Sequence, residues 1–149
     1  MFHLPPEDRL RAWRDFRKTL DLLPVNEAIH STVDFWQKCP FAPYYLDSAE
    51  SDLWPNPWDL IIENYYCDLA KSLGMLYTLY FTEHGKNLEI ELRIYIDPIS
   101  RHEYNLVFFD GGKYILNFQD GEVVEIGSIN KNLVLKYCYD NTDLKLEEY

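Results

Sequence analysis

Cysteine is scarce in this 149-residue chain, which has only Cys39, Cys67 and Cys138. An odd number of widely spaced cysteines fits neither a disulfide framework nor the paired spacing of a zinc site. We therefore expect three free thiols, which are typical of a reducing compartment, and no metal or other cofactor.

Long apolar runs are absent too, although 47% of the residues are hydrophobic. No stretch is long enough to span a bilayer as a helix. Residues 1–8 lack the basic start and apolar core of a signal peptide. These features predict a folded cytoplasmic protein with no membrane partner.

Basic residues are also few, with 14 Lys and Arg against 25 Asp and Glu and a net charge of −11. Such a charge repels the phosphate backbone of nucleic acids and the surface of anionic membranes. Neither is therefore expected as a partner.

The N-terminal part of the chain has helical periodicity. Apolar residues recur at steps of three and four in residues 5–21 and again in 25–36. Prolines at the start of the first stretch suit a helix N-terminus, and Pro40 disfavours helical geometry at Cys39, near which the second helix should end. We expect the basic residues of the first helix to lie on a solvent-exposed face.

Residues 57–74 have helical spacing as well, and they admit two interpretations. We favour one continuous helix that ends at Gly74. Alternatively, the helix restarts with Asn64 as its cap, which would place Cys67 in the first turn. The following residues, 75–82, are rich in aromatic and β-branched types and predict a strand.

The rest of the chain has strand patterning, with alternation of apolar and polar residues and a hairpin signal at Asp110-Gly111. The stretches that fit strands are 88–96, 102–109, 112–119, 123–126 and 133–139. The pattern predicts a single α+β domain, 1–149, with N-terminal helices packed on a C-terminal antiparallel sheet of about five or six strands.

A proline-rich segment, residues 40–58, carries two tyrosines and two tryptophans. Long irregular segments inside a domain are often lids or binding segments. The simpler interpretation is that the rings anchor the segment on the core. If the rings are exposed, we expect the segment to bind a protein or peptide.

Cys67 is the candidate nucleophile of the chain. A helix start favours a thiolate, but a lone cysteine is more often a small buried hydrophobic residue. A thiol nucleophile also needs a base and a group that holds that base. If the Asp110-Gly111 turn sets the hairpin register, His102 and Asn117 are diagonal neighbours on one face of the sheet, and Asn117 can hold the imidazole.

The order Cys67, His102, Asn117 resembles the transglutaminase-like cysteine hydrolase superfamily, over about residues 60–120. The resemblance implies a helix that bears the nucleophile and an antiparallel sheet whose adjacent strands carry the histidine and an acid or amide. It also implies that Cys67 attacks an acyl carbon, His102 acts as general base and then acid, and Asn117 orients His102. Residues 56–81 resemble small uncharacterised proteins of tailed bacteriophages.

Two functional hypotheses follow. The first is an acyl hydrolase or transferase with Cys67, His102 and Asn117 as catalytic residues, or a protein that keeps this fold without activity. The second is a non-catalytic assembly or interaction protein, such as a bacteriophage structural component in the host cytoplasm or the virion, that uses residues 40–58 as its contact surface.

Overall fold

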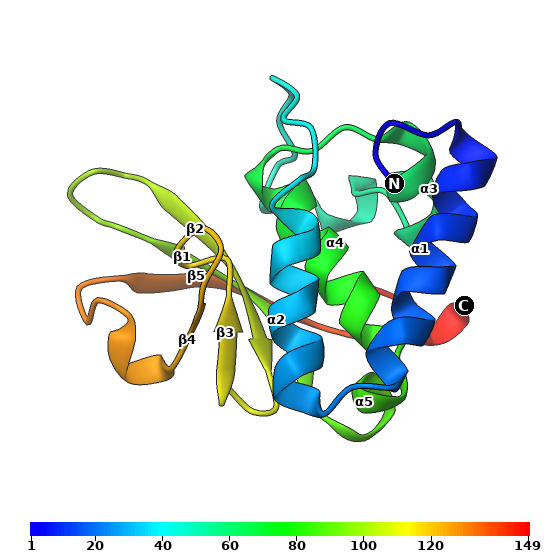
Figure 1. The fold of residues 1–149 in the computed structure, drawn as a ribbon. Helices are drawn as coiled ribbons and strands as arrows, with labels where there is room; N and C mark the ends of the chain where they lie inside the picture. Colours follow the sequence, from blue (N-terminus) through cyan, green and yellow to red (C-terminus); the bar gives the residue numbers. More distant parts are fainter.

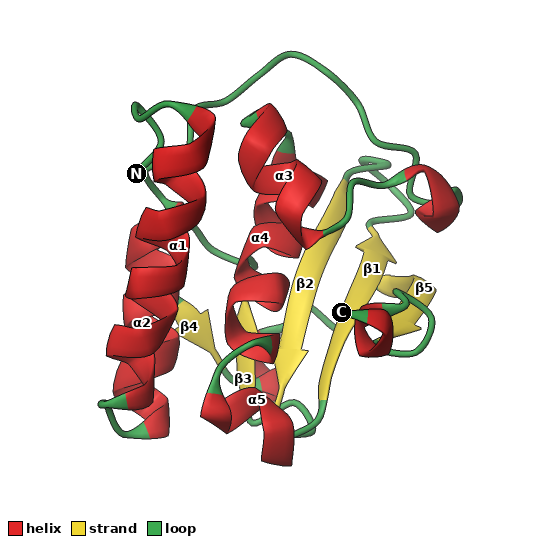
Figure 2. Cartoon of the chain, turned by 90° about the vertical axis from the view of Figure 1, so that its right-hand side faces the viewer, coloured by secondary structure: helices red, strands yellow, loops and turns green.

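Helices precede strands along the chain, and the two kinds of element form separate layers (Figures 1 and 2). The computed structural model describes all residues, 1–149. The helices are α1 (Pro6–Asp21), α2 (Val25–Trp36), α3 (Pro57–Glu63), α4 (Asp68–Tyr80) and α5 (Glu83–Asn87), with short 3₁₀ helices at Ser51–Leu53, Ile126–Ser128 and Leu146–Glu148. The strands are β1 (Ile90–Ile96), β2 (Glu103–Phe109), β3 (Tyr114–Leu116), β4 (Val123–Val124) and β5 (Val134–Asp140). The predicted α+β class is confirmed.

The strands form one antiparallel sheet in the order β4-β3-β2-β1-β5. β1 and β2 form the long central pair, with Ile90 opposite Phe109, and β5 returns from the end of the chain to pair with the other side of β1. Alternation along these strands gives the sheet two faces. The helix face packs on the helices, and the outer face carries a smaller cluster of Leu106, Phe108 and Ile115.

Both N-terminal helices match the sequence prediction, and Arg9 anchors the first one. Arg9 is only 8% exposed. Its guanidinium donates to the carbonyl oxygens of Ile61 at 2.9 Å, Ile62 at 2.6 Å and Leu4 at 2.5 Å. Because Ile61 and Ile62 belong to α3, these charge-assisted hydrogen bonds tie α1 to α3.

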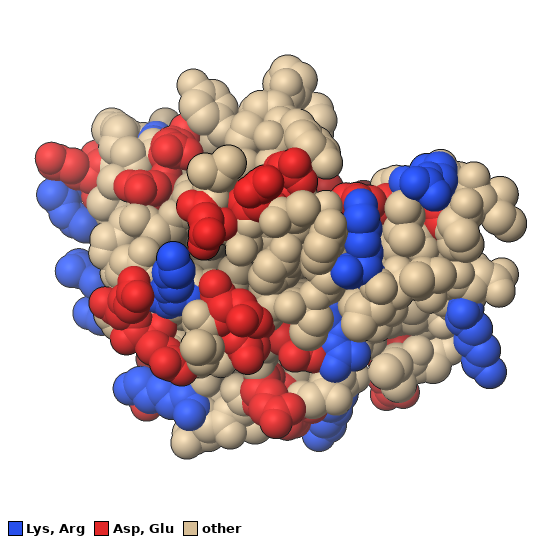
Figure 3. All heavy atoms as spheres, turned by 180° about the vertical axis from the view of Figure 1, so that it is seen from behind, with Lys and Arg blue, Asp and Glu red and all other residues tan.

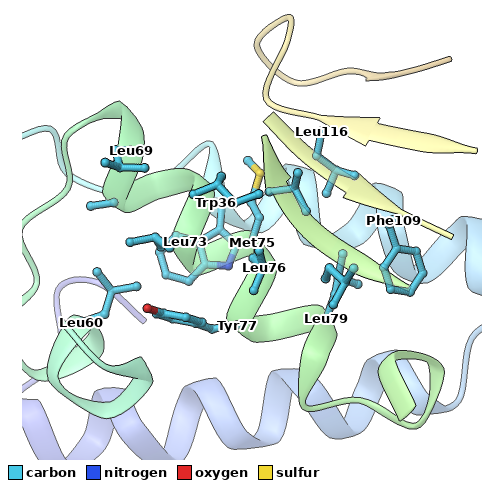
Figure 4. Close-up of a cluster of buried hydrophobic side chains, with 14 of the residues drawn as sticks. Trp36, Leu60, Leu69, Leu73, Met75, Leu76, Tyr77, Leu79, Phe109 and Leu116 are labelled. Carbon is cyan, nitrogen blue, oxygen red and sulfur yellow. The ribbon is translucent and has the colours of Figure 1, made fainter. Parts of the chain in front are cut away.

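The strand predicted at residues 75–82 is wrong, because α4 continues through this stretch to Tyr80. Every residue from Ser72 to Leu79 is buried. A helix that is buried all round lacks the amphipathic pattern that distinguishes a helix from a strand, and its packing overrides the strand preference of its aromatic residues. Figure 4 shows the α4 side chains between Leu60 of α3 and Phe109 of the sheet. Even so, neither α4 nor any other helix combines the length and apolar composition needed to cross a membrane.

Gly74, the predicted end of a helix, lies inside α4. The indole of Trp36 packs directly against its backbone and leaves no room for a side chain. A Cβ atom at Gly74 would lie 2.6 Å or less from three carbon atoms of the Trp36 ring. Trp36 Nε1 donates to Thr78 Oγ1 at 3.0 Å, and Trp13 Nε1 donates to the same oxygen at 2.9 Å. One hydroxyl group therefore joins α1, α2 and α4.

Candidate functional site

The helix predicted over residues 57–74 is broken just before Cys67. α3 ends at Glu63, and Asn64 adopts a left-handed conformation with φ 58° and ψ 37°, which asparagine tolerates better than most residues. Asn64 Nδ2 donates to the carbonyl oxygen of Phe2 at 2.9 Å, which fixes the turn. The preferred continuous helix is therefore wrong, and Cys67 is the N-cap residue of α4.

Cys67 is half-buried and lines a surface pocket of about 230 Å³ at the N-terminal end of α4. One turn further along α4, Lys71 Nζ bonds to Gln37 Oε1 at 3.2 Å and to Asp120 Oδ1 at 3.5 Å. The pocket is lined by Gln37, Cys39, Phe41, Tyr66, Cys67, Asp68, Lys71 and Asp120. The pocket thus offers two thiols, carboxylates and an ammonium group, but no imidazole.

Two thiols share this pocket, and an aromatic hydroxyl lies beside one of them. Burial raises the pKa of Cys39 to about 11, partly offset by the charge of Lys71. Burial also raises the pKa of Tyr44 to about 12, and the neighbouring Cys67 adds to this rise. The Tyr44 hydroxyl donates to the carbonyl oxygen of Tyr65 at 3.0 Å. Tyr44 therefore stays protonated at neutral pH and is unsuited to take a proton from Cys67.

Next to Cys67, the Asp68 carboxylate is held by two asparagines from the sheet. Asn105 Nδ2 donates to Asp68 Oδ2 at 2.8 Å. Asn117 Nδ2 lies 3.3 and 3.4 Å from the two carboxylate oxygens and donates to the Asn105 carbonyl at 3.0 Å. Both asparagines are buried, whereas Asp68 is exposed. The two buried amides therefore hold the carboxylate of Asp68, which itself lines the pocket.

Asn117 reaches this site through a register that differs from the predicted one. The hairpin pairs Phe109 with Tyr114, because its turn has four residues instead of two. Asn117 follows β3 with φ 71°, which interrupts the alternation, so both Leu116 and Asn117 lie on the helix face. The predicted placement of His102 beside Asn117 is therefore wrong.

His102 does not line the pocket of Cys67, and it lies just before the start of β2. It is exposed, and its ring contacts the ring of Tyr104 with 4.6 Å between centroids. Tyr104 packs on the outer face of the sheet, whereas Asn105 reaches Asp68 on the helix face. Of the three predicted catalytic residues, the structure brings Cys67 and Asn117 to one site and leaves His102 outside it.

No other imidazole takes the place of His102. His84 bonds to the carbonyl oxygen of Leu23 at 2.9 Å, and His30 bonds to that of Asn26 at 2.7 Å. His3 is exposed near the N-terminus. None of these rings lines the pocket of Cys67.

Sequence reasoning missed the roles of Asp68 and Asn105. Asn105 lies within the stretch 104–109, which is otherwise hydrophobic. A polar side chain in a buried strand almost always has a hydrogen-bond partner. This interruption was the signal that could have indicated a polar site at this point of the sheet.

The chain has a transglutaminase-like fold. Three solved structures of LapG from Legionella pneumophila share it, one calcium-bound, one EGTA-treated and one with neither description. Each has a TM-score of 0.71 and 14% sequence identity, and they cover 91–92% of this chain and 74–77% of LapG. No protein-family model and no curated protein sequence matches the chain. The resemblance of residues 56–81 to phage proteins stays a prediction.

Calcium is part of one LapG structure, so we asked whether the residues near Cys67 fit such an ion. No group of three or more His, Cys, Asp and Glu side chains in this chain is arranged to hold a metal. The asparagines beside Asp68 turn their NH₂ groups toward the carboxylate, and an NH₂ group is a donor. Calcium takes about six to eight oxygen ligands, and of these three side chains only Asp68 turns oxygens toward its neighbours, so they do not hold the ion by themselves.

Proposed function

We propose that this chain is a polypeptide-binding protein that keeps the transglutaminase-like fold without acyl-transfer chemistry. The observation that carries the proposal is the identity of the two sheet residues at the N-terminal end of α4, which are Asn105 and Asn117. A thiol nucleophile needs a group that takes its proton, and an amide does not do so. The resemblance in sequence implies a histidine on one of the two adjacent strands. The β2 residue whose side chain reaches Asp68 is instead an asparagine, Asn105.

The surroundings of Cys67 support a binding role. Phe41 is 79% exposed, lines the pocket and forms a β-bridge with Tyr66. Tyr65 is 59% exposed and packs against Tyr44, with ring centroids 6.1 Å apart. Exposed aromatic rings are enriched at protein interfaces, and a pocket beside them can receive one side chain of the bound polypeptide.

Within residues 40–58, the part that supports binding is the beginning. Trp54, near the end of the segment, is only 8% exposed. Its Nε1 donates to the Asp47 carbonyl at 2.8 Å, and its ring packs on Tyr139 with 4.9 Å between centroids. Trp54 therefore anchors its own part of the segment on the core. Phe41 lines the pocket of Cys67 and Tyr44 packs against Tyr65, so these two rings remain for the proposed contact surface.

The absence of acyl-transfer activity is tested with an activated ester, p-nitrophenyl acetate, and the release of nitrophenol is measured. We expect the unmodified protein to show no turnover beyond that of its Cys67→Ala variant. An Asn105→His variant places an imidazole at the site, and general-base assistance then makes acylation of Cys67 about tenfold faster or more. Cys67→Ala in the Asn105→His background is the matched control and should abolish that gain.

Two outcomes of the ester assay would contradict the absence of acyl-transfer chemistry. Turnover by the unmodified protein that is lost in both Cys67→Ala and His102→Ala would establish the catalytic residues predicted from the sequence and refute the binding-only proposal. Turnover lost in Cys67→Ala but kept in His102→Ala would refute it as well, and would require another base.

The binding half is tested by selecting peptides on the purified protein from a random display library and measuring their affinity by fluorescence anisotropy. Phe41→Ser and alkylation of Cys67 should each weaken the selected peptides about tenfold or more. Leu22→Ser is the control, because Leu22 is 85% exposed and lies just after α1, at the opposite end of the helical layer from the site. Equal losses in Phe41→Ser and Leu22→Ser, or no selectable peptide, would contradict the proposal.

A further inference from the structure

A groove between α1 and α3 combines arginine side chains with tryptophan rings. It has a volume of about 260 Å³ and is lined by Leu10, Arg11, Trp13, Arg14, Arg17 and Trp58. The three arginines recur every three residues, so they lie along one side of α1. Trp58 of α3 is 40% exposed, and its ring meets the Trp13 ring nearly edge-on, with 5.6 Å between centroids.

The charge of this groove contrasts with that of the rest of the molecule. Residues 9–18 contain five of the 14 basic residues of the chain and one of its 25 acidic residues. Figure 3 shows acidic side chains gathered across the back of the molecule. The middle of α1 is therefore a basic stretch on an otherwise acidic protein.

Arg17 has hydrogen-bonding capacity that the protein itself does not use. Its guanidinium carbon lies 4.1 Å from the centroid of the Trp13 ring and 5.8 Å from that of Phe81. It forms no ion pair, and its Nε is buried without a partner. Burial lowers the pKa of Arg17, which the charge of Asp21 opposes, but an arginine stays protonated at neutral pH. A guanidinium stacked on a ring presents its terminal NH groups to an anion.

The other two arginines have acidic neighbours of their own. Arg11 Nη1 bonds to Asp8 at 2.9 Å, and Arg14 Nε lies 3.6 Å from Asp15. The side chains in both pairs are about half exposed or more. Exposed ion pairs contribute little free energy, so a carboxylate of a partner can replace Asp8 or Asp15 at small cost.

We propose that the groove between α1 and α3 binds an acidic segment of a partner polypeptide. Its carboxylates pair with Arg11, Arg14 and Arg17, and an aromatic or aliphatic side chain packs on Trp58. Clusters of arginine are a recurring means of recognising acidic motifs. The groove shares no lining residue with the pocket of Cys67, so this site is independent of the proposed function.

The test uses a fluorescein-labelled, glutamate-rich peptide with one central phenylalanine, and measures its anisotropy at low ionic strength. We expect saturable binding that weakens as salt is added. Arg11→Glu combined with Arg14→Glu should lower the affinity about tenfold or more, because attraction becomes repulsion. Trp58→Ser should lower it about threefold, since the apolar contact is lost while the charges remain.

The matched control is Lys113→Glu combined with Lys131→Glu, which changes the net charge equally at exposed positions on the sheet side of the molecule. Its affinity should stay within about twofold of the parent, because these charges lie away from the groove. An equal loss in the control would show that net charge alone is responsible, and would overturn the proposal. Tighter binding of a single-stranded oligonucleotide or of tripolyphosphate than of the peptide, or no saturable binding, would overturn it too.

Discussion

Replacing Gly74 by alanine probes the packing that positions α4 and therefore Cys67. The new Cβ would lie 2.6 Å or less from three carbon atoms of the Trp36 ring, about 1 Å closer than ordinary carbon contacts. The ring cannot retreat easily, because Trp36 is fully buried and its Nε1 bonds to Thr78. Overpacking of this kind costs about 1–3 kcal/mol, here at the upper end, and the better helix propensity of alanine returns about 1 kcal/mol.

We therefore expect Gly74→Ala to lower the free energy of unfolding by about 2 kcal/mol. For a chain of this length that loss lowers Tm by about 4–8 °C. Urea denaturation monitored by tryptophan fluorescence measures the first quantity, and calorimetry measures the second. Gly127→Ala is the matched control, because no atom lies within 4 Å of its added Cβ, and it should change stability by less than about 0.5 kcal/mol.

A double-mutant cycle identifies the cause of the loss. Trp36→Phe removes part of the ring that the new methyl group meets, so Gly74→Ala should cost much less in that background, with a coupling energy of about 1 kcal/mol or more. A Gly74→Ala variant as stable as the parent would refute the reasoning. The same loss in both backgrounds would also refute it, since the indole would then not be responsible.

Four further predictions concern side chains that stabilise the helical layer and the thiols. Thr78→Val should lower the free energy of unfolding by about 2–4 kcal/mol, because it leaves two buried indole NH groups without an acceptor. The control Thr32→Val loses only a hydrogen bond to the Ala28 carbonyl and should cost about 1 kcal/mol. Urea denaturation of both variants measures the two losses. Arg9→Met should lower it by about 2–3 kcal/mol in the same assay, since three backbone carbonyls lose their charged donor, and an unchanged midpoint would refute the anchoring role. Iodoacetamide near neutral pH should modify Cys67 before Cys39 and Cys138, because burial raises the pKa of each of the latter two to about 11. Peptide mass spectrometry measures the rate at each cysteine, and equal rates would contradict the prediction. For Cys39 the folded pKa lies above the ordinary value of 9.0, so its contribution to stability is present below pH 9 and is lost between pH 9 and about 11; Cys39→Ala should flatten the fall of Tm over that interval.

Amphipathic elements were predictable from the sequence because each has one face toward the core and one toward water. α1, α2 and β1 have such a pattern, and they occur where the periodicity places them. α4 has no solvent-exposed face over most of its length, so the spacing of its apolar residues does not distinguish a helix from a strand. Its aromatic and β-branched residues then favoured a strand, whereas its burial within the core favours a helix.

The candidate site depends on two local backbone events that periodicity does not reveal. The left-handed residue Asn64 separates α3 from α4 and makes Cys67 a helix cap. The left-handed residue Asn117 turns its side chain to the helix face, whereas the predicted two-residue turn made it a diagonal neighbour of His102. Cys67 and Asn117 could thus be named from the sequence, but the partner that faces them, Asn105, required the true register of the hairpin.

Asparagine and histidine codons differ only in their first base. The amide at position 105 and the imidazole that would complete a thiol–imidazole pair with Cys67 are therefore separated by one nucleotide substitution. Gain or loss of chemistry in this fold can then occur in a single genetic step, without any rearrangement of the helix and strands that hold the two positions together.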